Sequence, residues 1–327
     1  DAVDTLYRAA WDYEYASASY YALAQISNIN GNPAQAMEES EKAVAYNGMN
    51  IDAKNLLISL LRRAGRGKEA VSLAKDVQAF DPLNHYAARE LMLLGACGKE
   101  DFRKLVRRSP ENYLELAVHY LNNGFTGEGK AVLEESESVC PYPTTEYYLG
   151  ALADADGDKE TAAGWFANAS SLCTDYVFPF RLETVQPLRK ALEYNRDDAV
   201  AWYYLGNLWY QKQPDLARQA WEEAVKARPD YAMALRNLGW YWRFKDEGRP
   251  DKASDDWQKA IAYYKMAIEA DPSEAIFLTE CDEIMEYVPE HFSAQLLLNI
   301  CSLQGHNLAS LSLKQYQAFY AFHQDHL

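Results

Sequence analysis

The residues best suited to bind a ligand are aromatic and arginine side chains that recur at helical spacing between residues 203 and 243. They are Tyr203, Asn207, Tyr210, Arg236, Trp240 and Arg243. Tyr, Trp and Arg are enriched at binding hot spots, where removing one side chain costs about 2 kcal/mol or more. Arginine can hold a carboxylate through two parallel hydrogen bonds, and aromatic rings can pack on a peptide or a sugar ring. We predict a ligand groove here; the plainer alternative is packing rings and arginines that pair with nearby Glu or Asp.

Four further residues occupy equivalent positions earlier in the chain, and we include them in the predicted groove. They are Asn55, Arg62, Arg89 and Tyr147, while Tyr21 and Gln25 hold the same positions in the first full repeat.

Catalytic and metal-binding patterns are weak in this sequence. His323 and His326 form an H-x-x-H pair, but it lies at the extreme C-terminus, where chains usually fray. The sequence contains no H-E-x-x-H, G-x-S-x-G or C-x-x-C motif. The five cysteines are odd in number and widely separated, so we expect buried, reduced thiols and a cytoplasmic protein. We predict no catalytic residue, no metal site and no cofactor, and therefore not an enzyme.

The elements that position the candidate groove come from a repeated spacing. Trp202, Leu205, Gly206 and Trp209 are followed 33 residues later by Leu235, Leu238, Gly239 and Trp242. Between these two sets lie Ala217, Trp221 and Ala224, at i, i+4 and i+7, and then Pro229. The glycine allows two helices to approach closely, the rings fill the remaining space, and the proline ends the second helix. This pattern resembles the tetratricopeptide repeat, whose period is about 34 residues.

The repeat frame predicts an all-α fold, a right-handed α-solenoid of stacked antiparallel helix hairpins. Residues 1–16 fit the second helix of a truncated repeat; a short capping helix is the alternative. A first array follows at 17–176, with a degenerate unit at 85–109, and a linker helix at 177–198. A second array at 199–274 includes a repeat with an insertion, and degenerate helices at 275–327 form a cap.

The order of the segments resembles the repeat region of large bacterial proteins in which a mutarotase-like β domain of unknown function precedes the repeats. The segments are AWDYEYASASYYALAQI, FPFRLETVQPLRKALEYN and DDAVAWYYLGNLWYQKQ. The resemblance implies that an N-terminal domain has been removed from this sequence. It offers no catalytic residue to assign to this chain.

Charge restricts the kind of partner. With 32 Lys and Arg against 48 Asp and Glu, the chain has a net charge of −16, which disfavours nucleic acid and anionic membranes. The longest apolar runs are far shorter than the ~18 residues that suggest a membrane span. We predict a protein-interaction scaffold that binds a peptide or protein domain, including its own N-terminal domain, through its concave face. The alternative is the helical part of a carbohydrate-active or sugar-binding bacterial protein.

Overall fold

The computed structural model describes residues 2–245, 254–271 and Glu280, and the secondary structure of these residues is entirely helical. The predicted all-α solenoid of helix hairpins is confirmed; its right-handed sense stays a prediction. The chain forms two compact units, Asp1–Cys173 and Thr174–Leu327. This division falls three residues before the predicted boundary at 176. No helix in the described part of the chain combines the length and the apolar character that a membrane crossing requires.

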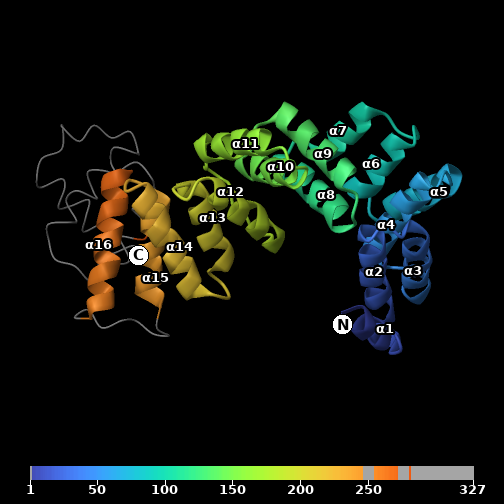
Figure 1. Ribbon diagram of the computed structural model, residues 1–327, viewed down its shortest axis with the longest axis horizontal. Coiled ribbons are helices and arrows are strands. Elements are labelled where there is room, and N and C mark those ends of the chain that lie inside the picture. The colour runs from blue at the N-terminus through green and yellow to red at the C-terminus, as the bar shows by residue number, and fades with distance from the viewer. Residues whose placement is uncertain (1, 246–253, 272–279, 281–327) are drawn as a thin grey trace, which may run out of the picture. The chain divides into compact units, whose positions relative to one another are not determined.

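The first unit is a series of antiparallel hairpins that follow a short helix, α1 (Ala2–Ala9) (Figure 1). The first helices of the hairpins are α2 (Tyr13–Ile29), α4 (Ile51–Arg63), α6 (His85–Leu93), α8 (Pro110–Asn122) and α10 (Pro143–Ala155). The second helices are α3 (Pro33–Tyr46), α5 (Gly67–Phe80), α7 (Lys99–Val106), α9 (Thr126–Val139) and α11 (Lys159–Ser171). Each second helix packs on its own first helix, and first helices of neighbouring hairpins also touch. The degenerate unit is thus a hairpin of two short helices, α6 and α7.

Local sequence explains where these helices begin and turn. Asn50 and Asn84 cap α4 and α6 by accepting hydrogen bonds from the amides of Ala53 and Ala87, at 3.0 and 2.8 Å. A glycine with a positive φ of 71–83° lies in each hairpin turn of this unit, where an L side chain would be strained. These glycines are Gly31, Gly65, Gly95, Gly124 and Gly157.

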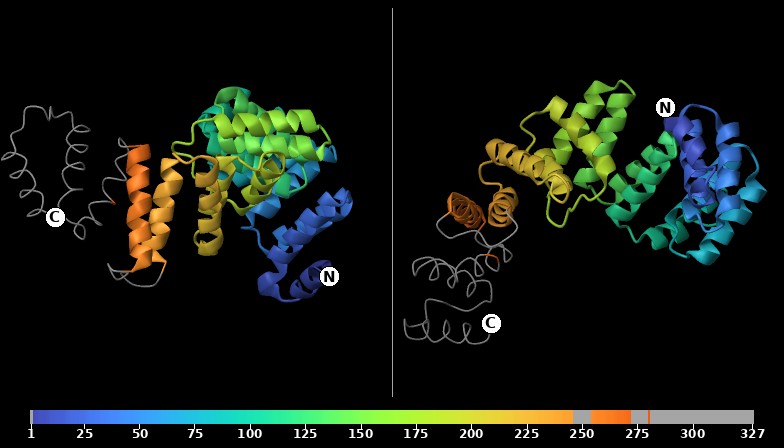
Figure 2. Two further views of the ribbon diagram at one scale, coloured as in Figure 1. Left: turned by 60° about the vertical axis from the view of Figure 1, so that its left-hand side comes forward. Right: turned by 90° about the horizontal axis from the view of Figure 1, so that it is seen from below.

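The second unit contains η1 (Leu182–Thr184), α12 (Val185–Tyr194) and two hairpins (Figure 1, Figure 2). The hairpins pair α13 (Ala199–Trp209) with α14 (Pro214–Ala227), and α15 (Ala232–Phe244) with α16 (Asp255–Ala270). In the segment 177–198, where we predict a linker helix, α12 packs on α13 within this unit. In the hairpin that carries the insertion, both helices are two residues longer than their counterparts, 13 against 11 and 16 against 14. The predicted cap at 275–327 lies outside the described residues, except for Glu280.

Close approach at glycine fixes the geometry of three hairpins. A Cβ on Gly206 would lie 2.2 Å from Nε1 of Trp221. The equivalent distances are 2.5 Å from Gly150 to Phe166 and 2.7 Å from Gly239 to Tyr264. In each case a ring on the second helix occupies the space that a side chain on the first helix would need. The predicted role of Gly206 and Gly239 is confirmed.

The cysteines depart from expectation. Cys140 and Cys173 are exposed and Cys97 is half-buried, so the prediction of buried thiols is wrong for all three. The reason is position: Cys140 caps the end of α9, and Cys173 follows α11, beyond the packed faces of both helices. Cys281 and Cys301 lie outside the described residues, as do His323 and His326.

Candidate functional site

The six predicted groove residues of the second unit lie on α13 and α15, the first helices of its two hairpins, with Tyr210 directly after the end of α13. Asn207 of α13 is the polar link between them. Its Oδ1 accepts hydrogen bonds from Nε1 of Trp221 at 3.1 Å and from Nδ2 of Asn237, on α15, at 3.0 Å. An amide oxygen that is satisfied in this way fixes the register of α13 against α15. Asn207 is therefore a structural link beside the candidate surface.

The two tyrosines of α13 differ in how far they are buried. Tyr203 is only 4% exposed and packs on Tyr231, with 5.0 Å between ring centroids. Burial raises the pKa of Tyr203, and a hydrogen bond with Asn207 partly opposes that rise. Tyr210 is half-buried and contacts both Trp221, at 5.4 Å between centroids, and the Trp240 side chain through a hydrogen bond. Tyr203 is thus a packing residue, whereas Tyr210 reaches the surface.

Arg236 does not have a free guanidinium. It forms a two-point ion pair with Glu280, in which Nε is 2.6 Å from Oε2 and Nη2 contacts Oε1. The hydroxyl of Tyr264 also donates to Glu280, at 3.3 Å. Burial alone would lower the pKa of Arg236, but the hydrogen bonds and charge of Glu280 outweigh it and raise that pKa. The carboxylate that we expected Arg236 to take from a ligand is already supplied by the chain itself.

Aromatic rings follow Arg236 along one side of α15, where Trp240 is half-buried and Phe244 is exposed. The guanidinium of Arg236 lies 4.9 Å from the centroid of the Trp240 ring. Trp240 in turn contacts Phe244 at 4.4 Å, and Arg243 lies 4.7 Å from the Phe244 ring. Phe244 is 43% exposed, although its ring has these two neighbours. The C-terminal half of α15 therefore presents a continuous strip of rings and guanidinium groups.

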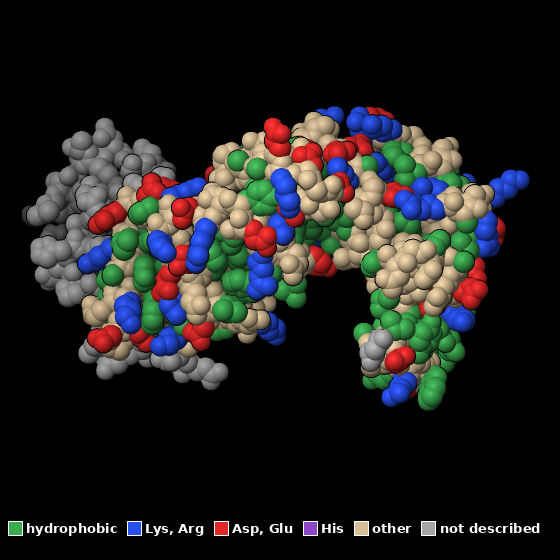
Figure 3. Space-filling view, in the orientation of Figure 1, with side chains coloured by type: hydrophobic (Ala, Val, Ile, Leu, Met, Phe, Trp, Pro, Cys, Tyr) green, Lys and Arg blue, Asp and Glu red, His purple; other side chains and the backbone are tan. Residues whose placement is uncertain are grey.

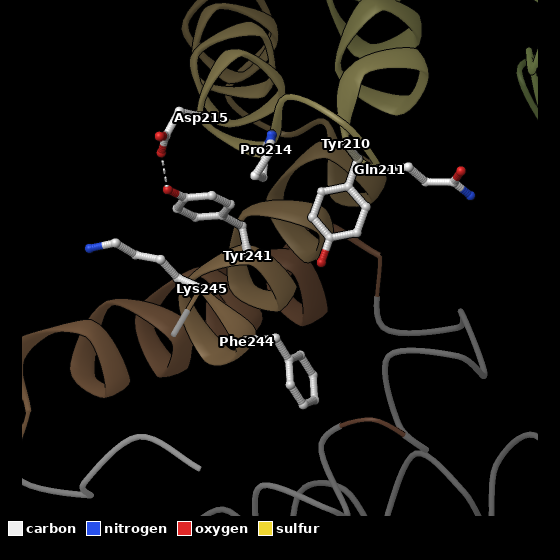
Figure 4. Close-up of a pocket in the computed structure, with 7 residues that line it drawn as sticks. All are labelled: Tyr210, Gln211, Pro214, Asp215, Tyr241, Phe244 and Lys245. Atoms are coloured by element: carbon white, nitrogen blue, oxygen red, sulfur yellow. Dashed lines mark hydrogen bonds between the residues drawn. The ribbon is translucent and has the colours of Figure 1, made fainter. Parts of the chain in front are cut away.

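A cavity of about 450 Å³ opens where this strip meets the turn between α13 and α14. It is lined by Tyr210, Gln211, Pro214, Asp215, Tyr241, Phe244 and Lys245. In Figure 4 the rings of Tyr210 and Tyr241 face the hollow from two sides, with Pro214 above and Phe244 below. The Tyr241 hydroxyl donates to Oδ1 of Asp215 at 2.5 Å. Burial and this hydrogen bond raise the pKa of Tyr241 to about 12, so it is a neutral phenol at physiological pH.

Sequence reasoning found only Tyr210 among these lining residues. Asp215 and Pro214 belong to the second helix, and the hairpin turn brings them back beside the end of α13. The available signal was the dense run of rings and cations WYWRFK at 240–245, which exceeds what hairpin packing needs.

The predicted groove residues of the first unit are engaged in internal contacts. Arg62 contacts two carboxylates, Glu90 at 2.6 Å and Glu128 at 2.9 Å, and Arg89 pairs with Glu135 at 2.6 Å. Tyr147 is fully buried and lies 6.5 Å from the Phe166 ring. Asn55 is 2% exposed, and its Oδ1 has no hydrogen-bond partner in the structure. The four residues do not form a group like the one on α13 and α15.

A buried polar network crosses the first helices of the first unit. Glu90 is fully buried and accepts hydrogen bonds from Ser59 at 3.0 Å and from Tyr120 at 2.8 Å, in addition to Arg62. Asn123, just after α8, extends the network to α2. Its side-chain oxygen accepts from Tyr21 at 3.2 Å and from Gln25 at 3.1 Å, and its carbonyl accepts from Asn28 at 2.6 Å. Side chains of the unit itself therefore occupy this part of its inner face.

A candidate for acid–base chemistry is the pair Glu137 and Glu146 at the contact of α9 with α10. Glu146 is 3% exposed. Burial, together with the charge and hydrogen bond of Glu137, raises the pKa of Glu146 to about 8. The pair therefore holds a proton at neutral pH. Within the described ranges, no three His, Cys, Asp or Glu side chains come together as metal ligands.

Stacked antiparallel hairpins, with a small residue that faces a ring on the second helix, define a helical-repeat protein of the tetratricopeptide type. No protein-family model matches the chain, and no curated protein matches it significantly.

Several solved structures of repeat proteins are similar to the chain. YrrB, a tetratricopeptide-repeat protein with an unusual peptide-binding site, is 16% identical; the match covers 74% of this chain and 97% of that one, with a TM-score of 0.27. MamA from Desulfovibrio magneticus is 15% identical; the match covers 68% of this chain and 96% of MamA, with a TM-score of 0.26. PilF from Pseudomonas aeruginosa is 15% identical; the match covers 83% of this chain and 99% of PilF, with a TM-score of 0.27. These TM-scores are too low to support a conclusion about this chain, and the fold is established by the helices described above.

Proposed function

We propose that this chain is a protein-interaction scaffold that binds a peptide segment at the surface formed by α13 and α15. The observation that carries the proposal is the continuous strip of Trp240, Phe244 and Arg243 beside an open cavity. Tyr, Trp and Arg are enriched at binding hot spots, and the rings of Tyr and Trp bury a large contact area at little entropic cost. The segment comes from another protein or from the N-terminal domain that the family resemblance implies.

The internal ion pairs limit how this surface binds. Arg236 is neutralised by Glu280, so the strip holds a peptide mainly through its rings and not through a carboxylate clamp. The peptide lies across Trp240 and Phe244 and places one side chain in the cavity. The sugar-binding alternative gains no support from the contacts of the described residues.

Selection of peptides from a displayed random library, followed by fluorescence anisotropy with the full chain, tests the proposal. The Trp240→Ala variant should bind the selected peptides at least tenfold more weakly, as expected for a hot-spot ring. The matched control is Trp11→Ala, because Trp11 is 87% exposed in the first unit and its loss leaves the candidate surface intact. Equal binding by both variants, or no selected peptide at all, would contradict the proposed function.

A further inference from the structure

We propose that the cavity between α13, α14 and α15 binds a cationic side chain, a lysine or an arginine, of the partner peptide. The inference rests on the proposed function and specifies the chemistry that its site recognises. Its first support is the composition of the walls. Three aromatic rings, those of Tyr210, Tyr241 and Phe244, line one hollow, and the carboxylate of Asp215 stands at its edge. Rings attract a cation through their negative faces, and a carboxylate adds direct charge attraction.

The second support is that the lining cation does not oppose such a ligand. Lys245 contributes its aliphatic stem to the wall, while its ammonium contacts Oδ2 of Asp256 at 3.3 Å. In Figure 4 the Lys245 side chain extends away from the three rings. The nearby Arg218 is held by Glu222, with both carboxylate oxygens 2.6 Å from Nη1. Lys245 and Arg218 are therefore each paired with a carboxylate, while the guanidinium of Arg243 lies 4.7 Å from the Phe244 ring.

The third support is charge complementarity. The chain carries a net charge of −16, and three of the four arginines in the predicted groove, Arg62, Arg89 and Arg236, pair with glutamates of the chain. On the face shown in Figure 3, acidic and basic side chains are intermixed over α12–α16, so this face has no basic patch that would attract an acidic peptide. An acidic protein attracts basic segments over distances of about a Debye length, ~8–10 Å at physiological salt.

The size of the cavity agrees with one long side chain. Its volume of about 450 Å³ lies in the range of small-ligand pockets, ~300–1,000 Å³. A lysine or arginine stem can pack between the Tyr210 and Tyr241 rings, and its charged end then lies within reach of Asp215. The hydroxyl of Tyr241 already orients that carboxylate by donating to Oδ1, which leaves Oδ2 to receive the ligand.

A double-mutant cycle tests the inference on peptides taken from the displayed random library. The selected peptides should share a Lys or Arg at one position, and replacing it by norleucine, which keeps an aliphatic stem and removes the cationic group, should weaken binding about tenfold. In the Phe244→Ala and Asp215→Asn variants the same replacement should change the affinity less than threefold. Phe244 and Asp215 are both exposed, so circular dichroism should show both variants folded.

The control for overall charge is Asp230→Asn, which removes the same charge from an exposed residue of the same unit outside the cavity. It should keep the full tenfold effect of norleucine. Peptides that bind without a shared basic residue would overturn the inference and leave the proposed function standing. A norleucine effect that is equal in Phe244→Ala and in the unaltered chain would also overturn it, since the ammonium would then lie elsewhere. Failure to select any peptide, or selection of oligosaccharides alone in a parallel glycan array, would overturn both proposals.

Discussion

Replacing Gly206 by alanine should destabilise the second unit, even though alanine favours helices. The added Cβ would lie 2.2 Å from Nε1 and 2.4 Å from Cδ1 of Trp221, which is 2% exposed and enclosed on all sides. Overpacking of this kind costs about 1–3 kcal/mol. If Trp221 moves, it also loses its hydrogen bond to Asn207, worth about 1 kcal/mol. The gain in helix propensity from Gly to Ala is about 1 kcal/mol, so the net loss is about 2 kcal/mol.

The assay is urea unfolding followed by tryptophan fluorescence and far-UV circular dichroism. Six of the eight tryptophans belong to the second unit, so fluorescence reports mainly on the part that Gly206 affects. With an m-value of about 2 kcal/mol/M, a loss of about 2 kcal/mol lowers the unfolding midpoint by about 1 M.

Gly164→Ala, in the first unit, is the control for helix propensity, and far-UV circular dichroism follows its unfolding. Gly164 lies in the middle of α11, and a Cβ there would meet no atom within 4 Å, so only the propensity gain remains. This variant should raise the free energy of unfolding by up to about 1 kcal/mol. Gly239→Ala, with a closest contact of 2.7 Å to the Tyr264 ring, should fall between the two. A Gly206→Ala midpoint equal to or above that of the unaltered chain would refute the view that glycine sets the distance between α13 and α14.

Two further predictions concern buried charge in the first unit. The free energy of unfolding should fall as pH rises from about 5 to 8, because folded Glu146 keeps its proton up to about pH 8 whereas an unfolded glutamate loses it near its ordinary pKa of 4.5. Glu146→Gln should remove that slope in urea titrations at pH 5, 6, 7 and 8, and a slope unchanged by the variant would exclude Glu146 as its source. Arg62→Met should cost about 3 kcal/mol, since it leaves the fully buried Glu90 without its counter-charge. Arg66→Met breaks two exposed ion pairs, with Glu41 and Glu69, and should leave the urea midpoint unchanged. Equal effects of the two arginine variants would show that burial of the ion pair is unimportant.

Contacts between distant parts of the chain at the candidate site could not be predicted from the sequence pattern. In the structure Trp240 and Arg243 lie on α15, and Tyr210, just after α13, forms a hydrogen bond with Trp240. The periodic spacing could not show that Arg236 is already bound by Glu280, 44 residues later in the chain. Spacing identifies which face of a helix a residue occupies, but not which distant carboxylate arrives on that face.

The same limit applies to the first unit. Tyr147 and Asn55 hold positions like those of exposed groove residues, yet both are buried. Asn123 carried no sequence signal, but it connects α8 to α2 through Tyr21 and Gln25, residues about 100 positions away. Such contacts depend on the rotation between successive hairpins, because small differences in rotation accumulate from one hairpin to the next.

The sequence by itself determined the helices, their hairpin pairing and the glycine–ring contacts, because these depend on residues within about 34 positions of each other. Tertiary structure alone decided which polar side chains stay available to a partner. That depends on ion pairs and hydrogen bonds between hairpins, where a carboxylate from a distant repeat neutralises an arginine and removes it from the binding surface. The cavity beside Tyr210 belongs to this second kind of feature, since three helices and one turn must meet before its walls exist.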